Sequence, residues 1–258
     1  MLELDHIVSF YPPPLRSFRK NILREYLQYK VLEIIYASPH GPALGFMGGT
    51  ALRIIHGQTR FSEDLDFDNR GLSKKGFEDM SEIVRKKLTL EGYQAETRLV
   101  FKGAFSCHLK MTHLLFETGL SGHEREKLLL KIDAEQQDFD YTCDKTLLSR
   151  FDVMTYVHAA PSSLLLAQKY AAFLGRKRTL GRDIYDAVFL SGKSEPDMAY
   201  LEAKLDIKSA AELKQRLLLK CETVDLKQAA KEVEPFLFNT TDSKKVLYFP
   251  DLVMKMDV

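Results

Sequence analysis

The sequence predicts an α+β fold: a mixed sheet with flanking helices in residues 1–160, followed by a helical half in residues 161–258. Two observations support this division. Segments with strand-like alternation or short apolar runs lie before Ala160-Pro161-Ser162, whereas apolar residues at helical spacing dominate after it. A change of pattern of this kind marks the boundary between two domains.

The first half contains helical patterns on either side of a short strand. Helices are expected over residues 15–36, 50–56 and 73–91. The first of them follows Pro12-Pro13-Pro14 and is amphipathic by pattern, and Thr50 and Ser73 are the expected N-cap residues of the other two. Leu44 to Met47 is a short apolar run, which predicts a buried strand.

The remaining strands and the helical half follow from the same periodicities. Strands are expected over residues 64–68, 93–101, 106–116, 127–134 and 151–157, and helices over 163–175, 181–191, 196–204, 208–220 and 225–235. In the first of these strands acidic and apolar residues alternate. Asp64, Asp66 and Asp68 therefore share one face, and Leu65 and Phe67 the other.

Charge and composition exclude several classes of protein. Lys and Arg number 37 and Asp and Glu 36, so no bulk attraction to nucleic acid is implied, although a local basic face remains open. The three cysteines are widely separated, which excludes a closed disulfide framework and a paired zinc or redox site. No secretion signal and no apolar run of about 20 residues is present. We expect a soluble, cytoplasmic protein without a membrane partner.

The segment most informative about chemistry combines two features. Gly48-Gly49 precedes a short helix, where glycine lets the backbone approach a phosphate and free N–H groups favour negative charge. Asp64 and Asp66 follow that helix with a spacing that places both carboxylates on one strand face, close enough to hold a divalent cation. Each feature alone is common on protein surfaces. In this order, joined by one short helix, they indicate a nucleotide site that contains metal ions.

Asp133 is a third candidate acid. It lies near the end of a nearly apolar segment and shares a strand face with Lys131. Because an isolated carboxylate is costly to bury, an acid in this position needs a partner, and a metal ion would be one. Asp68 lies on the face of the acid pair but at the end of its strand, where we expect a loop contact and no metal.

The stretch from Gly48 to Asp68 contains Gly-Gly-Thr-Ala-Leu-Arg and then Arg-Phe-Ser-Glu-Asp-Leu-Asp-Phe. It closely resembles the AbiEii/AbiGii toxin family, whose members are nucleotidyltransferase-like proteins of the DNA polymerase beta superfamily. The resemblance continues at Lys169 and at Gly-Arg-Asp-Ile-Tyr-Asp, residues 181–186. Matching blocks therefore extend from about residue 41 to about residue 190, and the tail beyond them has no match.

The resemblance implies a nucleotidyltransferase-like first domain and a helical second domain that completes the active-site cleft. It further implies the transfer of a nucleoside monophosphate from a nucleoside triphosphate (NTP) with Mg²⁺ or Mn²⁺ as cofactor. In this sequence the metal ligands would be Asp64, Asp66 and Asp133, and the triphosphate contacts Gly48, Gly49, Thr50 and Ser62. The metal ions would clamp the reacting phosphates while the third acid orients the attacking hydroxyl.

The second half contributes a basic and acidic motif. The resemblance implies that Lys169 directs its ammonium to the β- and γ-phosphates, that Asp183 orients Lys169 or reaches the nucleotide, and that Arg182 also contacts the nucleotide. The alternative is a solvated basic face in which Arg182 and Asp186 form an i, i+4 pair, worth only about 0.2–0.5 kcal/mol. For the basic run 176–178 we expect a surface that could also attract a polynucleotide.

Proteins that resemble this one often act as the toxin of a toxin–antitoxin pair, restrained by a separately encoded antitoxin. We therefore expect an Mg²⁺- and NTP-dependent nucleotidyltransferase whose partners are the nucleotide and an antitoxin. The acceptor stays open between the 3′ end of an RNA such as tRNA, a small molecule and a protein side chain. A further alternative is a protein that binds a nucleotide or an antitoxin without turnover.

Overall fold

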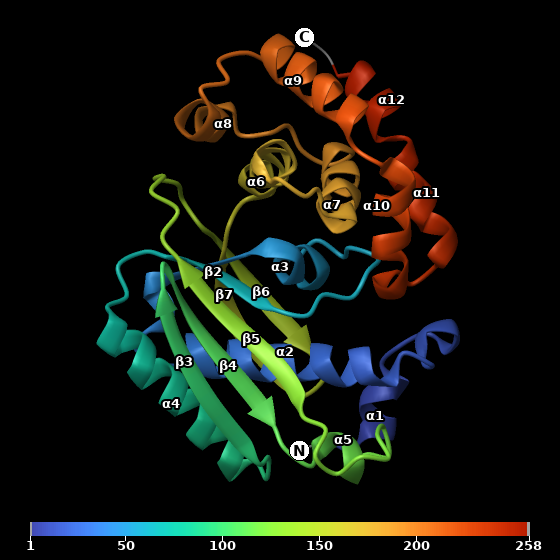
Figure 1. Ribbon diagram of the computed structural model, residues 1–258. Helices are drawn as coiled ribbons and strands as arrows, with labels where there is room; N and C mark the ends of the chain where they lie inside the picture. Colours follow the sequence, from blue (N-terminus) through green and yellow to red (C-terminus); the bar gives the residue numbers. More distant parts are fainter. Residues whose placement is uncertain (1, 257–258) are drawn as a thin grey trace. The chain divides into compact units, whose positions relative to one another are not determined.

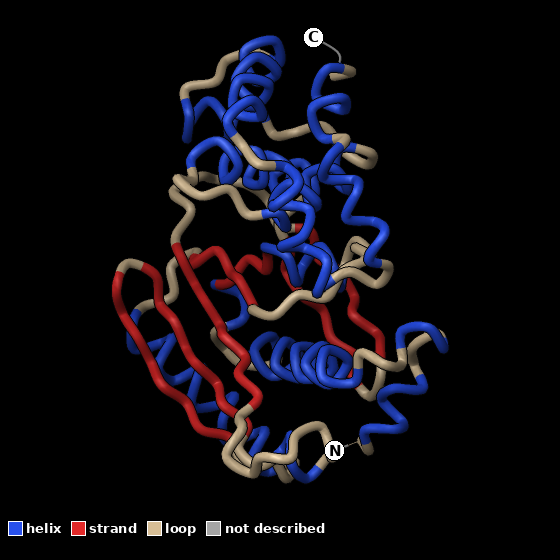
Figure 2. Tube along the Cα trace, turned by 45° about the vertical axis from the view of Figure 1, so that its right-hand side comes forward, coloured by secondary structure: helices blue, strands red, loops and turns tan. Residues whose placement is uncertain are grey.

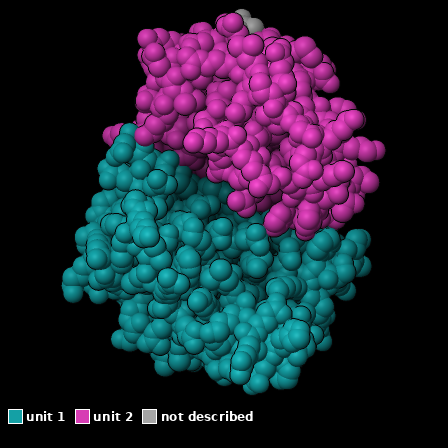
Figure 3. All heavy atoms as spheres, in the orientation of Figure 1, with its two compact units in different colours: residues 1–56, 61–138, 143–159 teal, residues 57–60, 139–142, 160–258 magenta. Residues whose placement is uncertain are grey.

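The computed structural model describes residues 2–256 of the chain, and these residues form two compact units. Unit 1 comprises residues 1–56, 61–138 and 143–159, and unit 2 comprises residues 57–60, 139–142 and 160–258 (Figure 3). The main change of unit therefore falls at residue 160. The two short segments 57–60 and 139–142 lie earlier in the sequence but belong to unit 2.

The strands of the described residues all lie in unit 1 and form one seven-stranded mixed sheet (Figures 1 and 2). The order is β3-β4-β5-β2-β1-β7-β6. The strands are β1 Leu44–Met47, β2 Leu65–Asn69, β3 Ala95–Lys102, β4 Ala104–Met111, β5 Leu128–Glu135, β6 Asp144–Arg150 and β7 Val153–Ala159. The β2–β5 and β1–β7 pairs are parallel and the others antiparallel. The predicted mixed sheet is confirmed.

Two helices cover one face of this sheet. The helices of unit 1 are α1 Leu4–Ser9, α2 Arg19–Tyr36, α3 Gly48–Ile54, α4 Lys74–Leu90 and α5 Leu114–Glu117, with short 3-10 turns at Pro13–Leu15 and Gly41–Ala43. Helix α2 packs on β7 and β5, and α4 packs on β3 and β4 (Figure 1). Phe67, Ile132 and Val157 point to this side and are almost fully buried.

The opposite side of the sheet carries the polar residues of the central strands. Side chains alternate between the faces, so Asp66, Lys131 and Asp133 lie away from the buried Phe67 and Ile132. We call this side the carboxylate face. Its half-buried acids lie on strands whose other face is packed against helices, which fixes their backbone.

Helix α2 differs from the amphipathic helix that we predicted over residues 15–36. It begins at Arg19 and buries residues on all sides, among them Glu25, Gln28 and Lys30. Each of these polar side chains has a partner: the Glu25 carboxylate, for example, accepts from the Arg53 guanidinium at 2.8 and 3.0 Å. Burial of a charge is tolerated when it is paired in this way.

Unit 2 is helical, as predicted for the second half. Its helices are α6 Ser162–Gly175, α7 Gly181–Ser191, α8 Met198–Leu205, α9 Ala210–Thr223, α10 Leu226–Val233, α11 Lys244–Leu247 and α12 Phe249–Met254, with 3-10 turns at Glu234–Phe236 and Thr240–Ser243. Gly181 starts α7 against α10, and a Cβ atom at this position would overlap the Ala229 carbonyl. Close packing of the two helices therefore requires glycine there. No helix within residues 2–256 is long and apolar enough to span a membrane.

Several predicted elements need correction. Strand β6 and helix α1 were not predicted. The strand expected over 106–116 ends at Met111, and Phe116 lies in the short helix α5. Thr50 does not cap its helix, because α3 already begins at Gly48 and its N-cap residue is Met47. The Ser73 cap is confirmed, since its side chain accepts from the Gly76 N–H.

Candidate functional site

Three carboxylates lie on or beside two neighbouring strands of unit 1. Asp66 on β2 is directly opposite Asp133 on β5, in a parallel pair that also joins Leu65 to Ile132. Asp64 lies in the segment that enters β2. All three are half-buried. The register of two central strands thus brings the acids of two distant sequence motifs together on the carboxylate face.

Lys131 lies among these acids. Its Nζ is 2.5 Å from Asp133 Oδ2, and the Ser106 hydroxyl donates to Asp133 Oδ1 at 2.6 Å. The hydrogen bond to Asp133 raises the pKa of Lys131, and the charges of Asp64 and Asp66 add to this effect. The sequence pattern had placed Lys131 and Asp133 on one face. The structure shows that the lysine itself is one partner of this acid.

Gly48 lies against the Asp66 side chain. Its φ of +75° is a left-handed conformation that L side chains rarely adopt. A Cβ atom at this position would overlap the Asp66 carboxylate. Gly48 is therefore needed for two reasons, the turn from β1 into α3 and the close approach of that turn to an acid on β2.

The segment that carries Asp64 is held by buried side chains. The Thr50 hydroxyl donates a short hydrogen bond to the Asp64 carbonyl, and Thr50 is fully buried within α3. The Gln28 amide of α2 donates to the Ser62 carbonyl at 3.0 Å. Thr50 thus contacts the backbone of the first acid; its expected contact with the triphosphate stays a prediction. Ser62 is half-buried in the same segment, and Gly49 is buried at the start of α3.

The donor atoms of this site suit a hard cation. The carboxylate face offers carboxylate oxygens, which Mg²⁺ and Mn²⁺ prefer over sulfur or imidazole. Within residues 2–256 no group of three or more His, Cys, Asp or Glu side chains forms a ready-made metal site. The arrangement thus fits the mode in which one or two carboxylates bind the ion together with substrate phosphates.

The motif residues of the second half form a buried ion-pair cluster in unit 2. Lys169 Nζ lies 3.2 Å from Asp183 Oδ1 and 2.9 Å from Asp186 Oδ2. Arg60, in the segment 57–60, binds Asp186 through two parallel hydrogen bonds of 2.7 Å. The Arg60 and Asp186 side chains are only 3% and 0% exposed, so this pair is shielded from water.

The cluster keeps its charges although it is buried. Burial favours the neutral form of Asp186, but Arg60 and Lys169 outweigh it and lower the Asp186 pKa to about 2. Burial likewise opposes the charge of Lys169, and Asp186 and Asp183 together raise its pKa. Arg60, Lys169 and Asp186 therefore stay ionised at neutral pH. Asp183 contacts the Lys169 ammonium; that it orients this lysine for a nucleotide stays a prediction.

The i, i+4 pair considered for Arg182 and Asp186 is not formed, because Asp186 binds Arg60 and Lys169. Arg182 is half-buried, and no carboxylate of residues 2–256 lies within 4.0 Å of its guanidinium as an ion-pair partner. Arg176 does pair, with its Nη1 2.7 Å from Asp183 Oδ2. One exposed residue of the basic run thus contacts the buried cluster.

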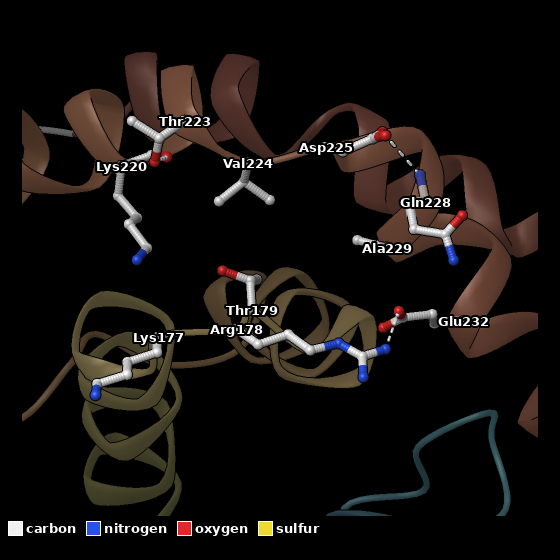
Figure 4. Close-up of a pocket in the computed structure, with 10 residues that line it drawn as sticks. All are labelled: Lys177, Arg178, Thr179, Lys220, Thr223, Val224, Asp225, Gln228, Ala229 and Glu232. Carbon is white, nitrogen blue, oxygen red and sulfur yellow. Dashed lines mark hydrogen bonds and ion pairs between the residues drawn. The ribbon is translucent and has the colours of Figure 1, made fainter.

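The other two residues of that run line a pocket in unit 2. A pocket of about 420 Å³ is lined by Lys177, Arg178, Lys220, Thr223 and residues of α10, and the Arg178 side chain points towards Glu232 (Figure 4). Arg178 pairs with Glu232 at 2.5 Å, and Asp225 accepts from the Gln228 N–H. Acidic groups therefore line the pocket alongside the basic ones, so it is not a uniformly basic surface.

Two contributors were missed by sequence reasoning. Arg60 was quoted as part of the first motif but given no role, because its partner Asp186 lies 126 residues away. Gln28 lies in a helix that looked amphipathic. The only sequence signals were a position within the helical pattern for Gln28 and the place of Arg60 at the start of the motif.

Comparisons with known proteins identify the family of the chain. A family model described as nucleotidyl transferase AbiEii toxin, Type IV TA system, matches residues 30–242. The match extends beyond residue 190, where the recognisable sequence motifs end. A comparison with curated proteins gives no significant match.

Two solved structures from Helicobacter pylori share the fold. The crystal structure of JHP933 has a TM-score of 0.56 at 16% identity, over 91% of this chain and 90% of that one. A second protein, described as a candidate nucleotidyltransferase, has a TM-score of 0.55 at 16% identity, over 90% and 92% of the two chains. At this identity the likeness shows the fold alone.

Proposed function

This chain belongs to the AbiEii nucleotidyl transferase toxin family, and we propose that it transfers a nucleoside monophosphate from an NTP to an acceptor hydroxyl in a metal-dependent reaction. The observation that carries the proposal is the register of β2 and β5. It places Asp66 opposite Asp133 on an accessible sheet face, beside a glycine turn that touches Asp66.

Asp64 and Asp66 are the proposed ligands of the divalent cation, with Asp133 as the third acid. A bound Mg²⁺ or Mn²⁺ would supply the charge that neutralises the reacting phosphates and the leaving pyrophosphate. Asp133 would accept the proton of the attacking hydroxyl or orient it. Lys131 and Ser106 fix the orientation of the Asp133 carboxylate, and Lys131 balances part of the local negative charge.

Gly48, Gly49, Thr50 and Ser62 remain the proposed contacts of the triphosphate. Gly48 lies against the Asp66 side chain, and Thr50 donates to the Asp64 carbonyl. Lys169, Asp183 and Arg182 are the proposed contribution of unit 2. Lys169 already pairs with two carboxylates. A phosphate that binds this lysine must therefore compete with Asp183 and Asp186 for its ammonium.

The proposed acceptor is the 3′ hydroxyl of an RNA, and the proposed biological role is that of a toxin neutralised by its antitoxin. The family to which the chain belongs is a type IV toxin–antitoxin family, which supports the second point. Incubation of the protein with each labelled NTP, Mg²⁺ and total RNA tests both the reaction and its acceptor, because the labelled product is visible on a gel.

The experiment needs matched variants. Asp66→Asn and Asp133→Asn remove proposed site acids, and Glu135→Gln is the control, because Glu135 lies two residues beyond Asp133 on the same strand and is exposed. Label on RNA from the wild type and Glu135→Gln, but from neither site variant, supports the proposal. Label on the protein or on a small molecule would identify that molecule as the acceptor and contradict the proposed RNA acceptor. Equal labelling by all four proteins, or by none, contradicts it.

A further inference from the structure

Strand β6 is one edge of the seven-stranded sheet. It pairs with β7 along its whole length, from Asp144 opposite Ala159 to Arg150 opposite Val153. Within residues 2–256 it has no second strand neighbour, and no backbone hydrogen bond outside the sheet involves residues 144–150. The outer edge of β6 therefore presents backbone donors and acceptors, which can pair with another strand.

The two edges of the sheet differ in how they are protected. On β3, the opposite edge, the exposed residues Glu96, Arg98 and Lys102 are charged, which is a common protection against edge-to-edge pairing. Strand β6 carries the exposed charges Asp144 and Lys145 at one end, but its central residue is Leu147, which is 42% exposed. Neither a proline nor a bulge interrupts β6. Of the two edges, β6 is the one that suits a partner strand.

An apolar cluster surrounds Leu147. Leu147 lies opposite Tyr156 of β7, and Met154 is the next residue on the same side of β7. Tyr156 and Met154 are 53% and 70% exposed. The Lys145 ammonium lies 4.6 Å from the centre of the Tyr156 ring, which fixes one border of the cluster. Three large apolar side chains gathered in this way on a sheet edge indicate an interaction surface.

The sequence of β6 is complementary to itself. It reads Asp-Lys-Thr-Leu-Leu-Ser-Arg from 144 to 150. In an antiparallel pair with a two-fold axis at Leu147, each Asp144 lies opposite an Arg150, each Lys145 opposite a Ser149, and the two Leu147 side chains face each other. No like charges are opposed, and a row of Tyr156, Leu147 and the same two residues of the second copy crosses four strands.

Other registers lose this match. A two-fold axis at Thr146 would oppose Lys145 to Leu147 and Asp144 to Leu148, and it would leave two residues at the far end unpaired. The axis at Leu147 is the one that pairs all seven residues of the strand. A symmetric contact of this kind closes on itself as a dimer and does not propagate.

We propose that this protein forms a two-fold dimer in which β6 pairs in antiparallel fashion with β6 of a second copy, so that two seven-stranded sheets become one continuous sheet. The Arg150 guanidinium is already held over the Tyr11 and Phe151 rings and donates to the Phe10 carbonyl at 3.3 Å. Because the Arg150 guanidinium already has these contacts, its pairing with Asp144 of the second copy adds little to the affinity. The Asp144–Arg150 pairs mainly favour this register over others. One strand of seven residues is a small interface, so the dimer dissociates on dilution.

Cysteine cross-linking tests the register directly. In a background with Cys143→Ser and Cys221→Ser, Leu147→Cys places two thiols opposite each other across the axis, within about 4.5–5.5 Å at Cβ. Ser149→Cys, on the same strand and the same face, places its two thiols about 14 Å apart. We expect a cross-linked dimer with Leu147→Cys and none with Ser149→Cys. Equal cross-linking of both variants, or of neither, overturns the proposal.

Sedimentation velocity over a range of concentrations provides a second measurement. The wild type should shift towards a dimer as its concentration rises, and Leu147→Lys should stay a monomer, because it opposes two like charges at the axis. Leu219→Lys is the control, since Leu219 is 55% exposed on α9 and lies far from β6 in the sequence. A wild type that stays monomeric throughout, or a control that dissociates as much as Leu147→Lys, contradicts the dimer.

Discussion

The two groups of charged residues in this protein are built on opposite principles. On the carboxylate face of unit 1, Asp64, Asp66 and Asp133 are half-buried on a sheet. In unit 2, Arg60 and Asp186 are almost completely buried, and each acid there is matched by a base. The first group can reach a ligand, whereas the second is arranged to satisfy its own charges.

This difference follows from the cost of burial. A charge removed from water must be paired, and a carboxylate that binds both a guanidinium and an ammonium meets that condition. Acids that bind a cation and a phosphate must instead keep access to solvent. Sequence alone makes the two groups look alike, because Asp-x-Asp and Arg-Asp-x-x-Asp are both short charged motifs. Their burial separates half-buried acids from a cluster whose charges are paired with one another.

The largest expected effect is on the stability of unit 2. Arg60→Met leaves the buried Asp186 with one partner fewer and should lower the free energy of unfolding by about 3–5 kcal/mol. Arg178→Met is the matched control: its pair with Glu232 involves a side chain that is 78% exposed, and the loss should stay below about 1 kcal/mol. Urea unfolding followed by circular dichroism measures both. Equal losses would mean that the cluster is not a stabilising unit.

The next effect is on activity. Asp66→Asn keeps the size of the side chain but removes its charge, and should slow nucleotide transfer by about 100- to 1000-fold. The free energy of unfolding should change by less than about 1 kcal/mol, because Asp66 is half-buried on a sheet face. Rates at saturating NTP together with urea unfolding check the two parts. If Asp66→Asn keeps its activity but loses stability, Asp66 stabilises the fold and is not part of the proposed binding site.

A smaller effect depends on pH. The pKa of Asp186 in the folded protein is about 2, below its ordinary value of 3.8, so its ionised form stabilises the fold above about pH 4. This contribution, on the order of 2 kcal/mol, is lost as the pH falls from about 4 to about 2. The difference in unfolding free energy between the wild type and Asp186→Asn should therefore narrow over that range. A constant difference would refute the role of this ionisation.

An effect of similar size concerns the support of the first acid. Thr50→Val keeps the shape of the buried side chain but removes the hydrogen bond to the Asp64 carbonyl. We expect a loss of about 1–3 kcal/mol of stability and a moderate fall in the transfer rate. Thr50→Ser, which retains the hydroxyl, should recover the rate more than the stability. If Val and Ser lower the rate equally, Thr50 does not position Asp64.

Much of the fold was visible in the sequence because it depends on local pattern. The strand Leu44–Met47 and the helix Gly181–Ser191 have the predicted bounds, and the Ser73 cap forms as expected. Asp68 makes the predicted loop contact, accepting from the Gln137 N–H at 3.0 Å. Strand β6 was missed because its polar and apolar residues do not alternate regularly. Its extended conformation depends on the hydrogen bonds that it makes with β7.

The sequence by itself determined the family, the mixed sheet followed by a helical half, and the acids and glycines that make up the proposed site, because these are properties of short segments. Only the tertiary structure decided which residues meet. The parallel pairing of β2 with β5 puts Asp133 opposite Asp66, and Arg60 reaches Asp186 across 126 residues. The physical reason is that a charge finds its partner in space, once the apolar faces of the strands and helices have packed.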